Sequence, residues 1–121
     1  MILIVEDEAV IGWSLQQVLR LHGRSAIVTR DALHALREAR SSTPELIIAD
    51  LHMPGTINGW EFLDALEADP VLAKVPVVVV TGYADVAKLP PRVVLLTKPV
   101  VPEEMLQVID RLAPRGETTN S

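Results

Sequence analysis

The chain contains no cysteine and no excess of positive charge, and both absences exclude kinds of protein. Without cysteine, its 121 residues have no disulfide scaffold, no thiolate metal site and no cysteine nucleophile. The net charge of −5 argues against non-specific binding to nucleic-acid phosphates. No apolar run is long enough to span a membrane, and no signal peptide precedes the first strand-like run. We therefore expect a soluble, cytoplasmic protein whose partners include neither nucleic acid nor membrane.

What is present has the composition of a single globular domain. A hydrophobic content of 49% and a charged content of 22% are typical of a folded chain rather than a disordered one. A chain of this length buries roughly two-thirds of its unfolded surface, so it needs no metal or disulfide to fold. We expect one domain over residues 1–114 and a polar tail over residues 115–121.

Apolar runs typical of strands alternate with amphipathic runs typical of helices. The predicted strands cover residues 2–5, 25–29, 46–49, 77–80 and 93–96. Helices are predicted over residues 8–22, after Asp31 (with Leu33, Leu36 and Ala39 buried), from Gly59 and from Pro102. Right-handed crossovers then give an α/β fold, a doubly wound parallel sheet with helices on both faces.

The connection between the last two predicted strands is unusual. Only residues 84–89 could be helical there, because Pro90 and Pro91 stop any continuation. We therefore expect the fourth helix to be a single turn or to be replaced by a loop.

Polar groups follow four of the predicted strands. Glu6 and Asp7 follow the first, Asp50 ends the third, Thr81 follows the fourth and Lys98 follows the fifth. Ligands of such sheets bind at the carboxyl ends of the strands, so these groups are expected in one small region. Three carboxylates this close repel one another, and Mg²⁺, which prefers hard oxygen ligands, relieves the conflict. An ionised aspartate beside Mg²⁺ can attack a phosphoryl group and form an acyl phosphate.

These residues carry a resemblance to the receiver domain of two-component response regulators. It covers the chain from Ile2 to about Ala113 and rests on four motifs in order, which are Ile4-Val5-Glu6-Asp7-Glu8, Asp50-Leu51-His52-Met53-Pro54, Thr81-Gly82 and Lys98-Pro99. The resemblance implies a flavodoxin-like (βα)5 fold with strand order 2-1-3-4-5. It also implies a signalling switch that a histidine kinase or a histidine phosphotransfer protein phosphorylates.

The same resemblance assigns roles to single residues. It makes Asp50 the phosphoacceptor, with Thr81 hydrogen-bonded to the phosphoryl group and Lys98 paired with it. Mg²⁺ would be bound by Asp7, Asp50 and the backbone carbonyl of His52, with Glu6 acting largely through water. The bond between Lys98 and Pro99 would be cis. The chain would then be no enzyme, apart from phosphorylation and dephosphorylation of its own Asp50.

The chain departs from the receiver pattern in the elements that would report phosphorylation and in the length of its loops. Leu95 occupies the position of the family's switch aromatic residue, so an inward-turning Tyr or Phe cannot report phosphorylation. The loop over residues 54–59 is one residue longer than the commonest receiver version. The short stretch between Thr81 and Lys98 resembles an atypical subgroup with a reduced fourth helix. In the family, the positions of His52 and Tyr83 flank the path of the attacking water. The resemblance therefore implies that their bulk shields the acyl phosphate.

Two other functions compete with the phosphorylated switch. An Mg²⁺-dependent phosphohydrolase usually has a second acid two residues after its nucleophile, where this chain has His52, and the chain has no room for a substrate-binding cap. A pseudo-receiver, which binds proteins irrespective of phosphorylation, usually lacks an acid or the lysine, and this chain keeps all of them. The kinase is expected to contact Val10, Ile11, Ser14 and the loop after Lys98. Trp13 is either a partner contact or partly buried under a loop.

Overall fold

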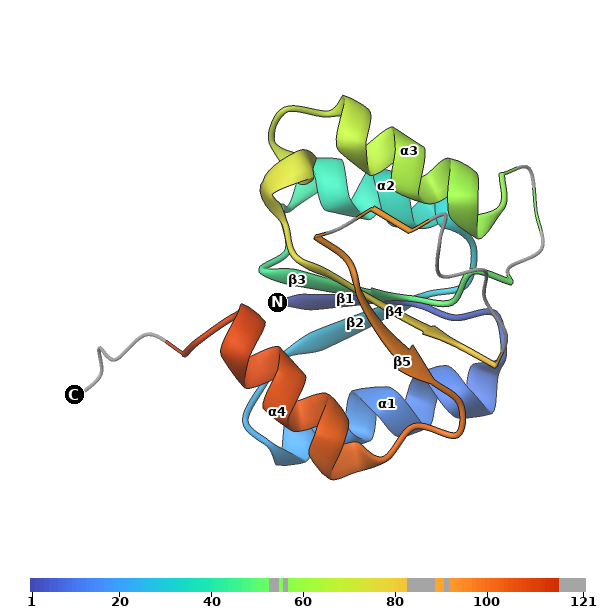
Figure 1. The fold of residues 1–121 in the computed structure, drawn as a ribbon. Coiled ribbons are helices and arrows are strands. Elements are labelled where there is room, and N and C mark those ends of the chain that lie inside the picture. The colour runs from blue at the N-terminus through green and yellow to red at the C-terminus, as the bar shows by residue number, and fades with distance from the viewer. Residues whose placement is uncertain (53–54, 56, 83–88, 91, 116–121) are drawn as a thin grey trace.

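The structure, a computed structural model, describes residues 1–52, 55, 57–82, 89–90 and 92–115 (Figure 1). Five parallel strands form one sheet in the order β2-β1-β3-β4-β5. Their bounds are β1 (Ile2–Val5), β2 (Ala26–Thr29), β3 (Leu46–Ala49), β4 (Val77–Thr81) and β5 (Val94–Thr97). The predicted flavodoxin-like sheet and its strand order are confirmed, and the predicted strand ends differ by one residue at most.

The helices cover both faces of the sheet. Their bounds are α1 (Ala9–Leu21), α2 (Ala32–Ser41), α3 (Gly59–Ala68) and α4 (Pro102–Leu112), with a short 3₁₀ helix η1 (Leu72–Lys74) before β4. Helices α1 and α4 lie on one face, and α2 and α3 lie on the other (Figure 1). None of the helices in the described part of the chain is long and apolar enough to cross a membrane.

Burial on both faces explains the apolar runs of the central strands. Every residue of β1, β3 and β4 is buried, as expected for strands covered by helices on both sides. Alternate residues of β1 point to opposite faces, so Leu3 packs in the cluster with α2 and α3, whereas Ile4 packs in the cluster with α1 and α4. Because the strands are parallel and adjacent, their carboxyl ends lie side by side at one edge of the sheet.

The buried face of α2 differs from the prediction at one position. Leu36 and Ala39 are buried as expected, but Leu33 is 40% exposed. The helix packs on the sheet through small side chains, and Ala32 and Ala35 are both buried. Because these alanines lie at the centre of the contact, Leu33 lies at its rim.

Little of the connection between β4 and β5 can be compared with the prediction. Residues 83–88 and 91 lie outside the described part of the chain, and so does most of the expected short fourth helix. The residues described there, 82, 89–90 and 92–93, are not helical. Arg92 fixes the end of this connection, because its side chain pairs with Glu67 and donates a hydrogen bond to the Val75 carbonyl.

Candidate functional site

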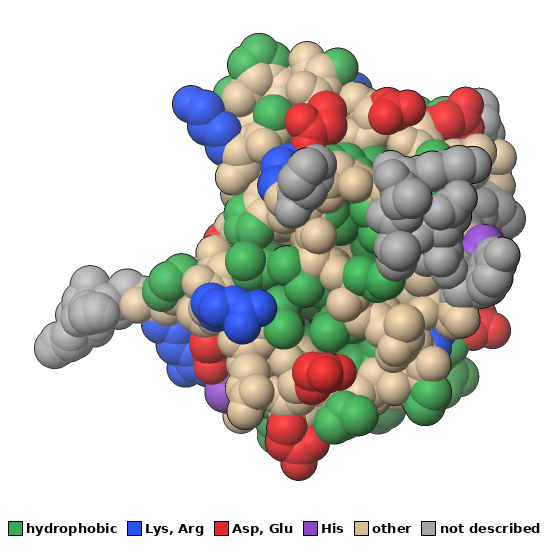
Figure 2. All heavy atoms as spheres, viewed as in Figure 1, with side chains coloured by type: hydrophobic (Ala, Val, Ile, Leu, Met, Phe, Trp, Pro, Cys, Tyr) green, Lys and Arg blue, Asp and Glu red, His purple; other side chains and the backbone are tan. Residues whose placement is uncertain are grey.

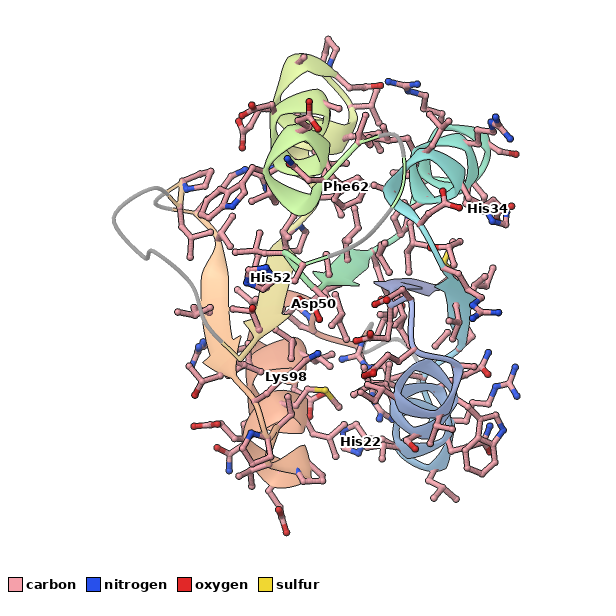
Figure 3. All side chains as sticks on the ribbon, turned by 90° about the vertical axis from the view of Figure 1, so that its right-hand side faces the viewer. His22, His34, Asp50, His52, Phe62 and Lys98 are labelled. Atoms are coloured by element: carbon pink, nitrogen blue, oxygen red, sulfur yellow. The ribbon has the colours of Figure 1, made fainter. Side chains whose placement is uncertain are left out.

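The predicted site residues meet at the carboxyl end of the sheet. Asp50, His52 and Lys98 lie close together there (Figure 3). Parallel pairing brings these strand ends together, because β1, β3, β4 and β5 are adjacent in the sheet and run in the same direction. His22 and His34 lie on other parts of the molecule, so the histidines form no common site (Figure 3).

Asp50 is a buried carboxylate with a donor on each side-chain oxygen. Its residue is 6% exposed. Lys98 Nζ donates to Oδ2 at 2.6 Å, and the backbone N–H of His52 donates to Oδ1 at 2.9 Å. The backbone N–H of Asp50 also donates to the Val5 carbonyl at 3.3 Å, which continues the contact between β1 and β3. The carboxylate is therefore held in one orientation beside an ammonium group, since buried charges require such partners.

Glu6 brings a second buried carboxylate to the same place. Its Oε1 lies 3.7 Å from Lys98 Nζ, and its Oε2 accepts a hydrogen bond of 3.2 Å from the Glu8 backbone N–H. Burial raises the pKa of Glu6, while the Glu8 N–H and the Lys98 charge lower it. The charge of Asp50 and a hydrogen bond with Asp7 raise it again, and the net shift is upward. Glu6 and Asp50 thus place two buried carboxylates beside the single ammonium group of Lys98.

Lys98 is the cation that faces both buried acids. Burial lowers the pKa of its ammonium group, but the hydrogen bond to Asp50 and the charge of Glu6 oppose this, and the net pKa is raised. The side chain as a whole is 28% exposed, so it is only partly covered by its neighbours. The bond between Lys98 and Pro99 is cis, as the resemblance implied. Lys98 therefore stays protonated at neutral pH and can pair with an anion at this site.

The other predicted residues surround this centre. Asp7 is partly exposed, and its backbone carbonyl accepts a hydrogen bond of 3.2 Å from Arg30 Nη2. Thr81 is fully buried at the end of β4, and its carbonyl accepts from the Lys98 backbone N–H at 3.0 Å. His52 is exposed beside Asp50. The structure thus brings together all the predicted site residues, except that Met53, Pro54 and Tyr83 lie outside the described residues.

The donor set suits a hard divalent cation. Asp7, Asp50 and the His52 carbonyl provide oxygen atoms, the type of ligand that such a cation prefers. Burial, and to a lesser extent the charge of Asp50, raises the pKa of Glu6. Within the described residues, no three His, Cys, Asp or Glu side chains form a ready metal cluster. The predicted Mg²⁺ shell needs only two direct side-chain ligands, with water and a carbonyl completing it, so this observation does not contradict it.

Sequence reasoning missed the close packing of α3 under the site. A Cβ added to Gly59 would lie 2.4 Å from the Leu51 carbonyl oxygen, so α3 begins in direct contact with the backbone that follows Asp50. The start of α3 is fixed by a capping box, in which Asn58 and Glu61 accept from each other's backbone N–H at 2.9 Å. The spacing Asn58-x-x-Glu61 is visible in the sequence and could have indicated this anchor.

An apolar groove begins beside the acidic centre. Its volume is about 550 Å³, and it lies between α1 and α4. The lining residues are Val10, Ile11, Ser14, Leu15, Val18, Val80, Lys98, Pro99, Val100, Pro102 and Met105. The residues expected to contact a kinase therefore share one surface. Trp13, on the same helix, is 61% exposed rather than covered by a loop.

A second apolar surface covers β5. Apolar side chains gather over this strand in the middle of one face, with acidic side chains above and below them (Figure 2). Leu95 is only partly buried and packs against the cluster of α2 and α3. It pairs with Val79 of β4. Leu95, at the position of the family's switch aromatic residue, thus makes an aliphatic contact between β5 and the core.

Comparison with known proteins agrees with this fold and site. Residues 2–110 match the family model described as response regulator receiver domain. The chain is 31% identical over 124 residues to the probable transcriptional regulator ycf29 of Pyropia yezoensis, a match that covers 94% of this chain and 53% of that protein. It is 34% identical to the polar-differentiation response regulator DivK of Brucella anthropi, over 69% of this chain and 67% of DivK. The chain therefore belongs to the response regulator receiver family, and the predicted family is confirmed.

A solved receiver structure shows the same fold. It is the receiver domain of a sensor histidine kinase from Pseudomonas aeruginosa, described with a magnesium ion coordinated in its active-site cleft. The TM-score is 0.84 at 22% identity, and the match covers 94% of this chain and 97% of that one. The present chain thus has the fold of a two-component signalling receiver over nearly its whole length.

Proposed function

We propose that the chain is a phosphoacceptor receiver, which takes a phosphoryl group from phosphohistidine onto Asp50. The observation that carries this proposal is the buried Asp50 carboxylate, 2.6 Å from the Lys98 ammonium and beside the second buried acid, Glu6. A buried aspartate at a strand end, held by a lysine in a family of signalling receivers, is suited to nucleophilic attack on phosphorus.

The transfer uses groups already in contact. One Asp50 carboxylate oxygen forms a bond to phosphorus as the bond between phosphorus and the donor's histidine nitrogen breaks, and the imidazole leaves with the electron pair. The Lys98 ammonium exchanges part of its contact with Asp50 for a phosphoryl oxygen and offsets its charge. The Thr81 hydroxyl, at the end of the neighbouring strand, donates to another oxygen.

Magnesium is the metal that we propose for this site. Asp7, Asp50 and the His52 carbonyl would bind it, with Glu6 acting largely through water. When bound, the ion supplies positive charge against the transferring phosphoryl oxygens. Support comes from the hard oxygen donors at the site and from the magnesium described in the receiver of the Pseudomonas kinase.

The donor of the phosphoryl group is proposed to be a histidine kinase or a histidine phosphotransfer protein that docks on the groove between α1 and α4. Val10, Ile11 and Ser14 line the groove together with Lys98. A partner bound in the groove is therefore next to the acidic centre. Val10 is 75% exposed, which leaves an apolar side chain ready for burial in a complex.

The output is proposed to be protein–protein contact. The chain covers 53% of ycf29, which is named as a probable transcriptional regulator, and 67% of DivK. Those proteins therefore contain residues outside the match. We propose no catalytic output for this chain beyond the phosphorylation and dephosphorylation of Asp50.

Phosphorylation by a small donor tests the proposal. The protein is incubated with acetyl phosphate and Mg²⁺, and its intact mass is followed beside Asp50→Asn and a matched variant, Asp64→Asn, which changes an exposed aspartate of α3. We expect one phosphoryl adduct in the wild type and in Asp64→Asn, and none in Asp50→Asn. An equal adduct in Asp50→Asn would overturn the assignment of the phosphoacceptor.

A further inference from the structure

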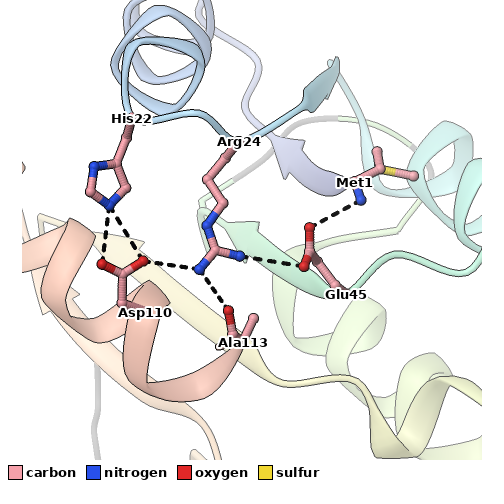
Figure 4. A network of polar contacts seen from close by, with 6 residues as sticks. All are labelled: Met1, His22, Arg24, Glu45, Asp110 and Ala113. Carbon is pink, nitrogen blue, oxygen red and sulfur yellow. Dashed lines mark hydrogen bonds and ion pairs between the residues drawn. The ribbon is translucent and has the colours of Figure 1, made fainter. Parts of the chain in front are cut away.

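A buried arginine lies at the amino end of the sheet, opposite the acidic site. The Arg24 side chain is only 4% exposed and contacts two distant segments (Figure 4). Its Nη2 donates to Asp110 Oδ1 at 2.9 Å and to the Ala113 carbonyl at 2.6 Å, and both acceptors belong to the end of α4. Its Nη1 donates to Glu45 Oε1 at 3.3 Å, just before β3.

The residues beside Arg24 tie α1 to the same point. His22 follows the last turn of α1, and its Nε2 lies 3.0 Å from Asp110 Oδ2 (Figure 4). The hydrogen bonds from Arg24 and His22 lower the pKa of Asp110, so this carboxyl is ionised over a wide pH range. Arg115 also packs here, because a Cβ added to Gly23 would meet its Nη1 at 3.0 Å. We call His22, Arg24 and Asp110 the clamp.

The groove opens at the opposite ends of the two helices and extends along α1 as far as Val18. The clamp joins the carboxyl ends of α1 and α4, whereas Val10 and Ile11 from the first turn of α1 face Pro102 and Met105 from the start of α4. Helix α1 has 13 residues, so about 20 Å of rigid helix separates the clamp from the mouth of the groove. A change in the angle between α1 and α4 at the clamp would therefore change the distance between the two helices at the mouth of the groove.

We propose that Arg24 is a positioning residue for partner docking, which sets the width of the groove between α1 and α4 by fastening the far ends of these helices. The inference rests on the proposed function, because the groove is the proposed docking site of the phosphohistidine partner. Removing the guanidinium leaves Asp110 and the Ala113 carbonyl without their buried donor. Helices that repack at subunit interfaces of allosteric proteins shift by about 1–2 Å, and we expect a displacement of that size here.

The chain offers a matched control for this arginine. Arg24 pairs with two carboxylates and donates to one carbonyl. Arg92 pairs with one carboxylate, Glu67, and likewise donates to one carbonyl, that of Val75, but it joins other segments. Arg92→Met therefore removes similar bonds without touching α1 or α4. Comparison of Arg24→Met with Arg92→Met separates an effect on the groove from a general loss of stability.

Spin-label distances measure the groove directly. Because the chain has no cysteine, Ala9→Cys and Glu104→Cys place two labels at exposed sites near the starts of α1 and α4. We expect Arg24→Met to shift the mean label distance by about 2 Å or to broaden its distribution clearly. Arg92→Met should leave the distribution unchanged. Arg24→Lys, which keeps the charge but loses the fork of donors, should restore it only in part.

Two results would overturn the proposal. An unchanged distance in Arg24→Met would make this arginine a stabilising residue only, and so would an equal change in Arg92→Met. If Arg24→Met does not fold, Asp110→Asn is measured against the same criteria. The distances need no phosphorylation, so they remain interpretable even if the acetyl phosphate experiment shows that Asp50 accepts no phosphoryl group.

Discussion

The contact between Gly59 and Leu51 predicts an unusual response to a small substitution. Gly59 is the first residue of α3, and an added Cβ would lie 2.4 Å from the Leu51 carbonyl oxygen and 2.5 Å from the Leu51 Cα. These atoms belong to the backbone directly after Asp50, and Leu51 itself is buried. The Leu51 backbone therefore cannot move away from an added Cβ without moving the segment that positions Asp50.

Two effects of Gly59→Ala oppose each other, and their sizes decide the outcome. In a helix interior alanine is favoured over glycine by about 1 kcal/mol, so at the first residue of α3 the gain in stability is at most this large. Overpacking against a fixed neighbour costs about 1–3 kcal/mol, and backbone atoms at 2.4 Å place this clash at the upper end. We therefore expect a net destabilisation of about 1–2 kcal/mol, or a decrease in Tm of about 3–10 °C.

Thermal unfolding of Gly59→Ala beside Gly82→Ala measures this effect. A Cβ added to Gly82 has nothing within 4 Å, so this control tests the loss of a glycine without a clash. We expect Gly82→Ala to keep the Tm of the wild type within about 2 °C. A Tm of Gly59→Ala equal to or above that of the wild type would refute the reasoning. Slower phosphorylation of Asp50 should accompany the loss of stability.

Three further predictions follow from the charges. Glu6→Gln should raise the Tm at pH 7. Folding raises the pKa of Glu6 above 4.5, so the protein loses stability as the pH rises through this pKa, and glutamine removes that loss. The increase in Tm should disappear when unfolding is measured at low pH. Lys98→Met should slow phosphorylation by acetyl phosphate about 100-fold, whereas Lys74→Met, at an exposed lysine, should not. Asp110→Asn should cost less than about 1 kcal/mol, since Asp110 is half-exposed. Because its pKa is lowered, that stabilisation exists above pH 3.8 and disappears at more acidic pH; a constant difference down to pH 2 would contradict this.

Much of the fold and the site could be predicted because both follow from local patterns. The continuous apolar runs of β1, β3 and β4 reflect burial on both faces, which the chain order alone implies. The site residues follow strands that run in the same direction, so the sequence predicted that Asp50 and Lys98 lie in one small region, and the structure places them in contact. Asp31 caps α2 as predicted, with its side chain accepting from the His34 N–H at 2.8 Å.

What could not be predicted depends on packing between distant segments. Arg24 is charged and precedes a strand, which is typical of an exposed residue, and only the approach of α4 buries it. Leu33 is an apolar residue of an amphipathic helix. Helix α2, however, packs on the sheet through its alanines, and this leaves Leu33 partly exposed. Pairing across 86 residues, as between Arg24 and Asp110, leaves no periodic signal in the sequence.

The central claim is that Asp50 accepts the phosphoryl group, and chemical trapping tests it most directly. The protein is treated with acetyl phosphate and Mg²⁺, reduced with borodeuteride and digested, and the peptides are sequenced by mass spectrometry. Reduction of an aspartyl phosphate gives a deuterated homoserine, and we predict this residue at position 50. A homoserine at another acidic position, such as Asp7, would contradict the account. So would the absence of homoserine from a sample whose intact mass shows the adduct.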